Sequence, residues 1–183
     1  MDKLIAWLAK PIVFTIGIAI IILFLLLILP NEASKAATYT PEGASFDTSF
    51  FYTPADVYTK AAAYSAEGRT AYIRARWTFD LVFPLAYGFF CLTAIAFGGS
   101  KLKINKKVLQ VLILLPILAV FFDLAENTMV SLVMANYPTE YVFLAFAAAI
   151  STLCKWICVM SAFSLALVLP AFAGILWLIR KNR

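Results

Sequence analysis

Four long apolar runs constrain the fold of this chain more than any other feature of its sequence. The first, residues 11–29, is long enough to cross a hydrocarbon core of about 30 Å. With 63% hydrophobic and 14% charged residues, the 183-residue chain is far more apolar than a soluble domain. We therefore predict an all-α integral membrane protein, a single domain over residues 1–183 folded as a four-transmembrane-helix bundle. The other three predicted spans are 78–97, 108–134 and 139–177.

The first run has a second interpretation, a cleaved signal peptide, because small residues follow it at 33–38. Its apolar length exceeds the roughly 7 to 15 residues of a signal-peptide core. We therefore expect an uncleaved helix. It has no charged residue beyond Lys10 and no polar side chain beyond Thr15, so we expect it to form an outer wall of the bundle.

The distribution of charge predicts the direction of the spans. The N-terminal residues, the 98–107 loop and the C-terminal tail carry nine lysines and arginines against one acid, Asp2. The 31–77 segment carries five bases and five acids. Because basic loops stay in the cytoplasm, we expect both termini and the 98–107 loop there and the 31–77 segment outside. The net charge of +5 follows this sidedness, so it does not indicate nucleic-acid binding.

The 31–77 segment contains signals of its own folded structure. Residues 31–45 are small and polar, and we expect them to be irregular. A helix over 54–66 is predicted by an N-cap threonine, a proline at the first helical position and an acid at the third, with Gly68 as its C-cap. A second helix should then run directly into the second span. The aromatic residues of the segment fit either an interfacial belt or a lid over the bundle.

Rare polar groups in three spans are predicted to lie at similar depth. A helix rises about 1.5 Å per residue. Counted from the cytoplasmic end of each span, Asp80, Asp123 and Lys155 then lie at heights of about 27, 23 and 33 Å. Glu126 and Asn127 share a helix face with Asp123, at spacings of three and four residues. Charges within spans normally face the bundle interior and pair with each other. We therefore expect these groups to meet in an outward-opening polar pocket.

Neighbouring helix faces supply further members of this cluster. Arg69, Tyr72 and Arg76 lie on one stripe with Asp80 if the helix is continuous, and the stripe continues through Tyr87. Thr152 lies beside Lys155 on the last span. Asp123 and Glu126 should meet Lys155 and one or more cations beneath the 31–77 segment. The arginines considered for this role are Arg69, Arg74 and Arg76.

Two interpretations of the cluster remain open, and both can hold at once. Buried ion pairs can act as a structural clamp that keeps helices in register. They can also form a site, since intramembrane ionisable groups are functional candidates by default. The candidate acid–base residues are Asp123, Glu126 and Asp80. The candidate ligand-binding or clamp residues are Asn127, Lys155, Arg69, Arg74, Arg76, Tyr72, Tyr87 and Thr152.

Three functions follow from these residues. The first is a membrane module that binds a lipid or other amphiphile, its anionic headgroup on the arginines and Lys155, or that docks a partner protein. The second is an intramembrane enzyme in which burial and a nearby lysine separate the pKa values of two carboxyls. The third is a transporter or proton channel, for which four spans are few. Membrane lipids are expected partners, and oligomerisation stays open.

Other chemistries are disfavoured by composition. The chain has no histidine, which excludes histidine-based triads and argues against a transition-metal site. Its three cysteines lie in apolar runs, and Cys154 and Cys158 are not a CxxC pair. The sequence has no glycine-rich phosphate loop and no nucleophile elbow. We predict no metal and no cofactor.

Several of these motifs together resemble a known pattern. Gly68-Arg69 with Tyr72, the Asp80-Pro84-Tyr87 spacing, Asp123-Glu126-Asn127, and Thr152 with Lys155-Trp156 resemble small four-helix inner-membrane proteins of bacteria. The resemblance covers most of the chain after residue 50. It implies a four-helix membrane fold in the bacterial inner membrane, and it implies no activity.

Overall fold

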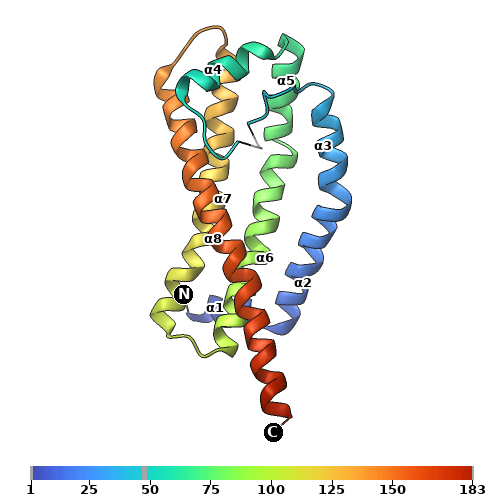
Figure 1. Cartoon of the computed structure of the whole chain (residues 1–183), viewed down its shortest axis with the longest axis vertical. Coiled ribbons are helices and arrows are strands. Elements are labelled where there is room, and N and C mark those ends of the chain that lie inside the picture. Colours follow the sequence, from blue (N-terminus) through green and yellow to red (C-terminus); the bar gives the residue numbers. More distant parts are fainter. Residues whose placement is uncertain (1, 47–48, 183) are drawn as a thin grey trace.

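The computed structural model describes residues 2–46 and 49–182, and this part of the chain contains helices and no strands. Four helical stretches in it are long and apolar enough to cross a membrane, which confirms the predicted number of long apolar helices. They stand side by side as a bundle, with both chain ends near one end of it (Figure 1). The four stretches are Pro11–Ala37, Ala66–Lys101, Lys106–Asn136 and Val142–Lys181.

The first stretch is longer than the predicted 11–29. A short helix α1 (Asp2–Leu8) precedes α2 (Pro11–Leu23), which continues through a π-helical turn η1 (Phe24–Ile28) into α3 (Leu29–Ala37). The region 31–45, expected to be irregular, is therefore helical in its first half. Two features account for this: the wide π turn directly precedes Pro30, and Lys35 pairs with Glu32 one turn away at 2.6 Å.

The described residues of the segment 38–77, which are 38–46 and 49–77, cover one end of the bundle, and we call them the cap (Figure 1). Helix α4 (Pro54–Ala63) begins with the predicted capping box, in which Thr53 and Asp56 exchange hydrogen bonds. These bonds from Thr53 hold the pKa of Asp56 below its ordinary value. We call the opposite end of the bundle, where α1 and the last turns of α8 lie, the tail end.

The cap differs from expectation where α4 ends. The predicted helix 54–66 stops at Ala63, because Ser65 caps a new helix, α5 (Ala66–Arg76), by accepting from the backbone N–H of Gly68 at 3.0 Å. Gly68 therefore lies in the first turn of α5 and is not a C-cap. A side chain there would come within 3.1 Å of the Tyr39 carbonyl, which explains the glycine.

Helix α6 (Phe79–Lys101) packs against three other helical stretches, so it forms the centre of the bundle. It does not run straight on from α5, because the backbone leaves helical geometry at Trp77 and Thr78. Glycines bring helices close to it. If Gly17 of α2 carried a Cβ, that atom would lie 2.5 Å from the Thr93 hydroxyl of α6. If Gly98 of α6 carried one, it would lie 2.6 Å from the Pro170 nitrogen of α8.

Helices α7 (Lys106–Asn136) and α8 (Val142–Lys181) are antiparallel neighbours and form the most extensive helix pair. The α7 helix exceeds the predicted span 108–134 by two residues at each end, whereas α8 begins three residues after the start of the predicted span 139–177 and ends four residues beyond it. The α2 helix packs on α6 and exposes much of its apolar surface, as Ile12 (65%) and Leu26 of η1 (69%) illustrate. The first span is thus an outer wall, as expected.

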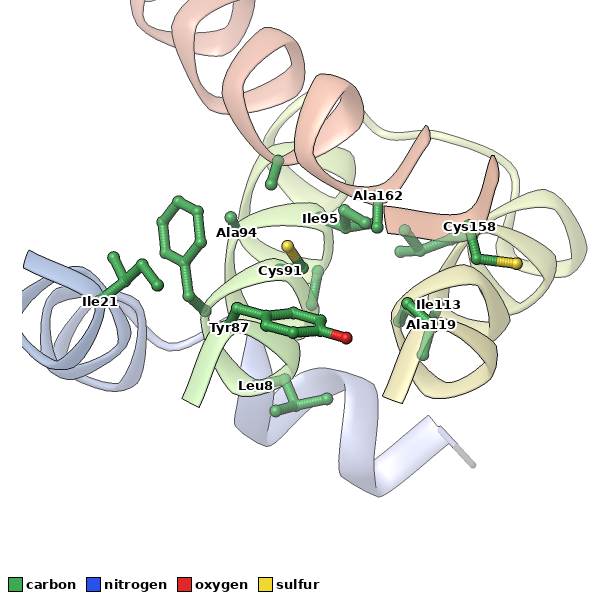
Figure 2. Close-up of a cluster of buried hydrophobic side chains, with 14 of the residues drawn as sticks. Leu8, Ile21, Tyr87, Cys91, Ala94, Ile95, Ile113, Ala119, Cys158 and Ala162 are labelled. Atoms are coloured by element: carbon green, nitrogen blue, oxygen red, sulfur yellow. The ribbon is translucent and has the colours of Figure 1, made fainter. Parts of the chain in front are cut away.

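The apolar interior has two parts. One lies toward the tail end among α1, α2, α6, α7 and α8, where Cys91, Ala94 and Ala162 let helices approach closely (Figure 2). The other joins the cap to α7 and α8 through Phe46, Tyr72 and small alanines. Tyr87 belongs to the first part, and its hydroxyl points toward the α7 ribbon in Figure 2.

Candidate functional site

Lys155 of α8 lies between the two carboxylates of α7. Its ammonium group forms an ion pair with Glu126 and lies 3.9 Å from Asp123. The spacing of three residues puts both acids on the α7 face that packs against α8. The predicted meeting of Asp123, Glu126 and Lys155 is therefore present in the structure.

Glu126 is also bonded to the cap. The hydroxyl of Tyr52, in the loop before α4, donates to its Oε1 at 3.0 Å, and Thr152 of α8 donates to the same oxygen at 2.6 Å. The Tyr52 and Thr152 hydroxyls are themselves 2.6 Å apart. One carboxylate therefore joins the cap, α7 and α8.

A second group of polar residues adjoins the first through Asn127. Arg76 forms an ion pair with Asp80 at 3.2 Å and donates to Asn127 Oδ1 at 3.4 Å, while the Asn127 amide donates to the Asp80 backbone carbonyl at 3.1 Å. The Arg76 guanidinium also lies 4.3 Å above the Tyr72 ring. These contacts span the break at Trp77–Thr78, so Arg76 and Asp80 still pair although the helix is not continuous.

Tyr87 completes the site on the α6 side by donating to Asp123 Oδ2 at 2.8 Å. We call the whole assembly the ionic cluster. Its members are Tyr52, Tyr72, Arg76, Asp80, Tyr87, Asp123, Glu126, Asn127, Thr152 and Lys155.

The ionic cluster is buried, which sets its electrostatics. The side chains of Glu126, Arg76 and Lys155 are 4%, 6% and 8% exposed, and those of Asp80 and Asp123 are less than one-fifth exposed. Buried charges lose hydration and are kept only where partners replace it. Three acids and two bases are described here, so the described charges sum to one negative charge. An anion added to this cluster would increase that imbalance.

Two predicted members of the cluster lie elsewhere. Arg69 donates to the backbone carbonyls of Tyr64 and Ala61 at 2.5 and 3.4 Å, and its guanidinium lies 4.6 Å above the Tyr137 ring. It joins α4 and α5 and does not reach the carboxylates. Arg74 is on the exposed face of α5. Of the cations considered for the cluster, Lys155 and Arg76 therefore contact its acids, whereas Arg69 and Arg74 do not belong to it.

Other contacts that fix the cap were not predicted as site features. The Trp156 indole N–H donates to the Ser49 carbonyl at 3.0 Å, and its ring lies 4.5 Å from that of Phe50. Lys60 donates to the Ser45 carbonyl at 2.7 Å and so fixes the same loop. The only signal for Tyr52 in the sequence was its place among cap aromatics that fit a lid. These contacts support the lid interpretation over a belt of separate rings.

The positions of the cavities and of possible metal ligands bear on what the cluster can bind. The two cavities described in the structure lie at the tail end, against α6, α8 and α1, and the ionic cluster lines neither. Within residues 2–46 and 49–182, no three His, Cys, Asp or Glu side chains are grouped to hold a metal ion. The described contacts of the cluster are ion pairs and hydrogen bonds, and the loop before α4 is bonded to it through Tyr52.

Comparison with protein-family models, curated proteins and solved structures finds no match for the chain. The function must therefore be argued from the site itself.

Proposed function

We propose that this chain is a multi-pass protein of the bacterial inner membrane, with both termini in the cytoplasm and the cap outside. The excess of nine bases over one acid at the tail end supports this direction. The resemblance to small four-helix inner-membrane proteins supports the four-helix membrane fold and the inner membrane as its location.

Within that topology, we propose that the ionic cluster binds the polar end of a lipid or other amphiphile when the cap loop moves aside. The observation that carries this proposal is the hydrogen bond from Tyr52 to the buried Glu126. Tyr52 belongs to a loop, and its hydroxyl bonds directly to a charged group inside the bundle. A ligand hydroxyl or amine could replace the phenol there and make the same bond.

The charges of the cluster narrow the class of ligand. Both described bases, Arg76 and Lys155, are already paired with carboxylates, and the charges of the described residues of the cluster sum to one negative charge. A head group that donates hydrogen bonds or carries positive charge fits this set better than the anionic head group first expected. The apolar part of the ligand would contact the surrounding helix faces and the cap aromatics.

The second candidate is an intramembrane enzyme that uses Asp123 and Glu126 as acid and base. The specific observation in its favour is their unequal sharing of Lys155: Glu126 forms the close pair, whereas Asp123 is at 3.9 Å and accepts from Tyr87. Two carboxyls in different surroundings can hold their protons differently, as acid–base chemistry requires. A structural clamp needs no such inequality.

Native mass spectrometry of the protein released from membranes tests the binding proposal. We expect a co-purifying amphiphile on the parent chain, its loss from the D123N/E126Q variant, and equal or stronger retention in Y52F, because the ligand then no longer competes with the phenol for Glu126. Tyr64→Phe is the matched control, because its hydroxyl bonds to Ala44 within the cap. An empty parent chain, with a large fall in the thermal midpoint of D123N/E126Q, would leave the clamp as the sole role.

A further inference from the structure

A cavity of about 540 Å³ lies at the tail end, between the last turns of α6 and the last turns of α8. Its volume is in the range of small-molecule sites. Phe97, Pro170 and Trp177 form part of an apolar wall. A Cβ added at Gly174 would meet no atom within 4 Å, so α8 presents bare backbone to this space.

Three cations also line this cavity: Lys101, Lys103 and Arg180. No carboxylate is among its described lining residues. The acid of this end, Asp2, lines the other cavity, pairs with Lys106 and accepts from Gln110 at 3.1 Å. Lys103 borders that second cavity as well, but Asp2 forms its ion pair with Lys106. Among the described residues, none of the three cations has an ion-pair partner.

The backbone at Lys103 adds an independent observation. Its φ is +56°, in the left-handed region that favours glycine, where the chain turns after α6. The backbone N–H of Ile104 donates to the Gly99 carbonyl at 3.0 Å and closes this turn. A lysine at this position costs backbone strain that a glycine would not. The strained position adds a third positive charge to the cavity.

We propose that this cavity binds an anionic phospholipid, with its phosphate on Lys101, Lys103 and Arg180 and its acyl chains along the apolar wall. Guanidinium and ammonium groups both bind phosphate well. Basic pockets between helices on the cytoplasmic side are suited to such head groups. The site is at the opposite end from the ionic cluster and uses none of its residues, so it rests on the proposed direction in the membrane and not on the ligand proposed for that cluster.

Native mass spectrometry of the full chain with defined lipids tests the site. Phosphatidylglycerol is compared with phosphatidylcholine of the same acyl chains, and glycerol 3-phosphate serves as the free anion. We expect phosphatidylglycerol to bind at least about tenfold more tightly than either, since each basic residue near an anionic surface contributes about fivefold in affinity and the site has three. The K101Q/K103G/R180Q variant should lose that preference.

Two variants separate a site from general charge or folding effects. K3Q/K10Q/K107Q removes the same charge from exposed positions outside the cavity and should change the preference less than about twofold. K103G alone should weaken phosphatidylglycerol several-fold while leaving the thermal midpoint unchanged or raised, because glycine suits the turn. An equal loss in the exposed triple variant, equal binding of glycerol 3-phosphate, or unchanged binding in K103G would overturn the proposal.

Discussion

Tyr52, in the loop before α4, donates a hydrogen bond to Glu126, 74 residues later in α7. The same carboxylate oxygen accepts from Thr152 of α8. A single buried atom thus receives bonds from the cap and from the bundle. The stability of the cap and the ionic state of the bundle interior are therefore linked through it.

The first prediction tests that bond. Tyr52→Phe removes the hydroxyl and leaves the ring packed edge-on against Phe46. We expect it to lower the free energy of unfolding by about 1.5 kcal/mol, the low end for a bond to a charged group, because Thr152 still donates to Glu126. Denaturant unfolding in detergent micelles measures this. Tyr64→Phe, which loses a longer bond of 3.4 Å, should cost less; the reverse order would contradict the assignment.

The second prediction concerns the Lys155–Glu126 pair. Lys155→Met leaves two carboxylates in the bundle without this cation and should cost about 3–5 kcal/mol. Adding Glu126→Gln should recover more than half of that loss, because the second buried charge is then gone as well.

A surface pair provides the control for this cycle. Lys35→Met breaks the ion pair between Lys35, whose side chain is 60% exposed, and Glu32. It should lower the free energy of unfolding by less than about 1 kcal/mol. If Lys155→Met were as mild as Lys35→Met, the buried pair would carry no special role in stability.

The third prediction concerns close helix packing. Gly98→Ala would place a Cβ 2.6 Å from the α8 backbone at Leu169 and Pro170, so the helices must separate. We expect a loss of about 1–3 kcal/mol in stability, as for other overpacked cores. Gly174→Ala, in open space on α8, should be neutral or stabilising. Similar thermal midpoints for the two variants would show that the α6–α8 contact is not this close.

The fourth prediction tests the proposed direction in the membrane. Ala62→Cys in α4 and Asn182→Cys beyond α8 place exposed thiols at opposite ends of the bundle. In intact bacteria whose outer membrane has been permeabilised, a membrane-impermeant maleimide should label the first and not the second. The parent chain is the control, since Cys91 and Cys158 are buried and Cys154 is half-buried. Labelling of the Asn182→Cys variant alone would reverse the topology.

The helices and the centre of the cluster could be predicted because their signals are physically strong. Rare charges in apolar helices must find each other, so Asp123 and Glu126 identified Lys155 as their partner. Arg69 could not be assigned in this way. It binds the carbonyls of Tyr64 and Ala61, and every residue offers a carbonyl.

The features that the sequence did not predict lie in loops and at a break between two helices. Tyr52 lies outside any regular element, so no periodicity indicates where its hydroxyl points. The break at Trp77–Thr78 is likewise not marked in the sequence, since no glycine or proline lies there. The outward-opening pocket stays a prediction, because its opening depends on how the cap moves.

The pairing of α7 with α8 has a consequence for how the chain is assembled in the proposed topology. During synthesis the first span carries no charge in its apolar run, so it can rest in lipid alone. A lone charged residue at a helix centre costs roughly 2.5–3.5 kcal/mol on insertion, and α7 brings two such acids. Lys155 follows in the next helix, after a short connection at 137–141. If the two helices insert together as a hairpin, Lys155 neutralises part of this charge as the helices leave water. Release of α7 alone into lipid would instead expose two unpaired carboxylates to the hydrocarbon, which is unfavourable.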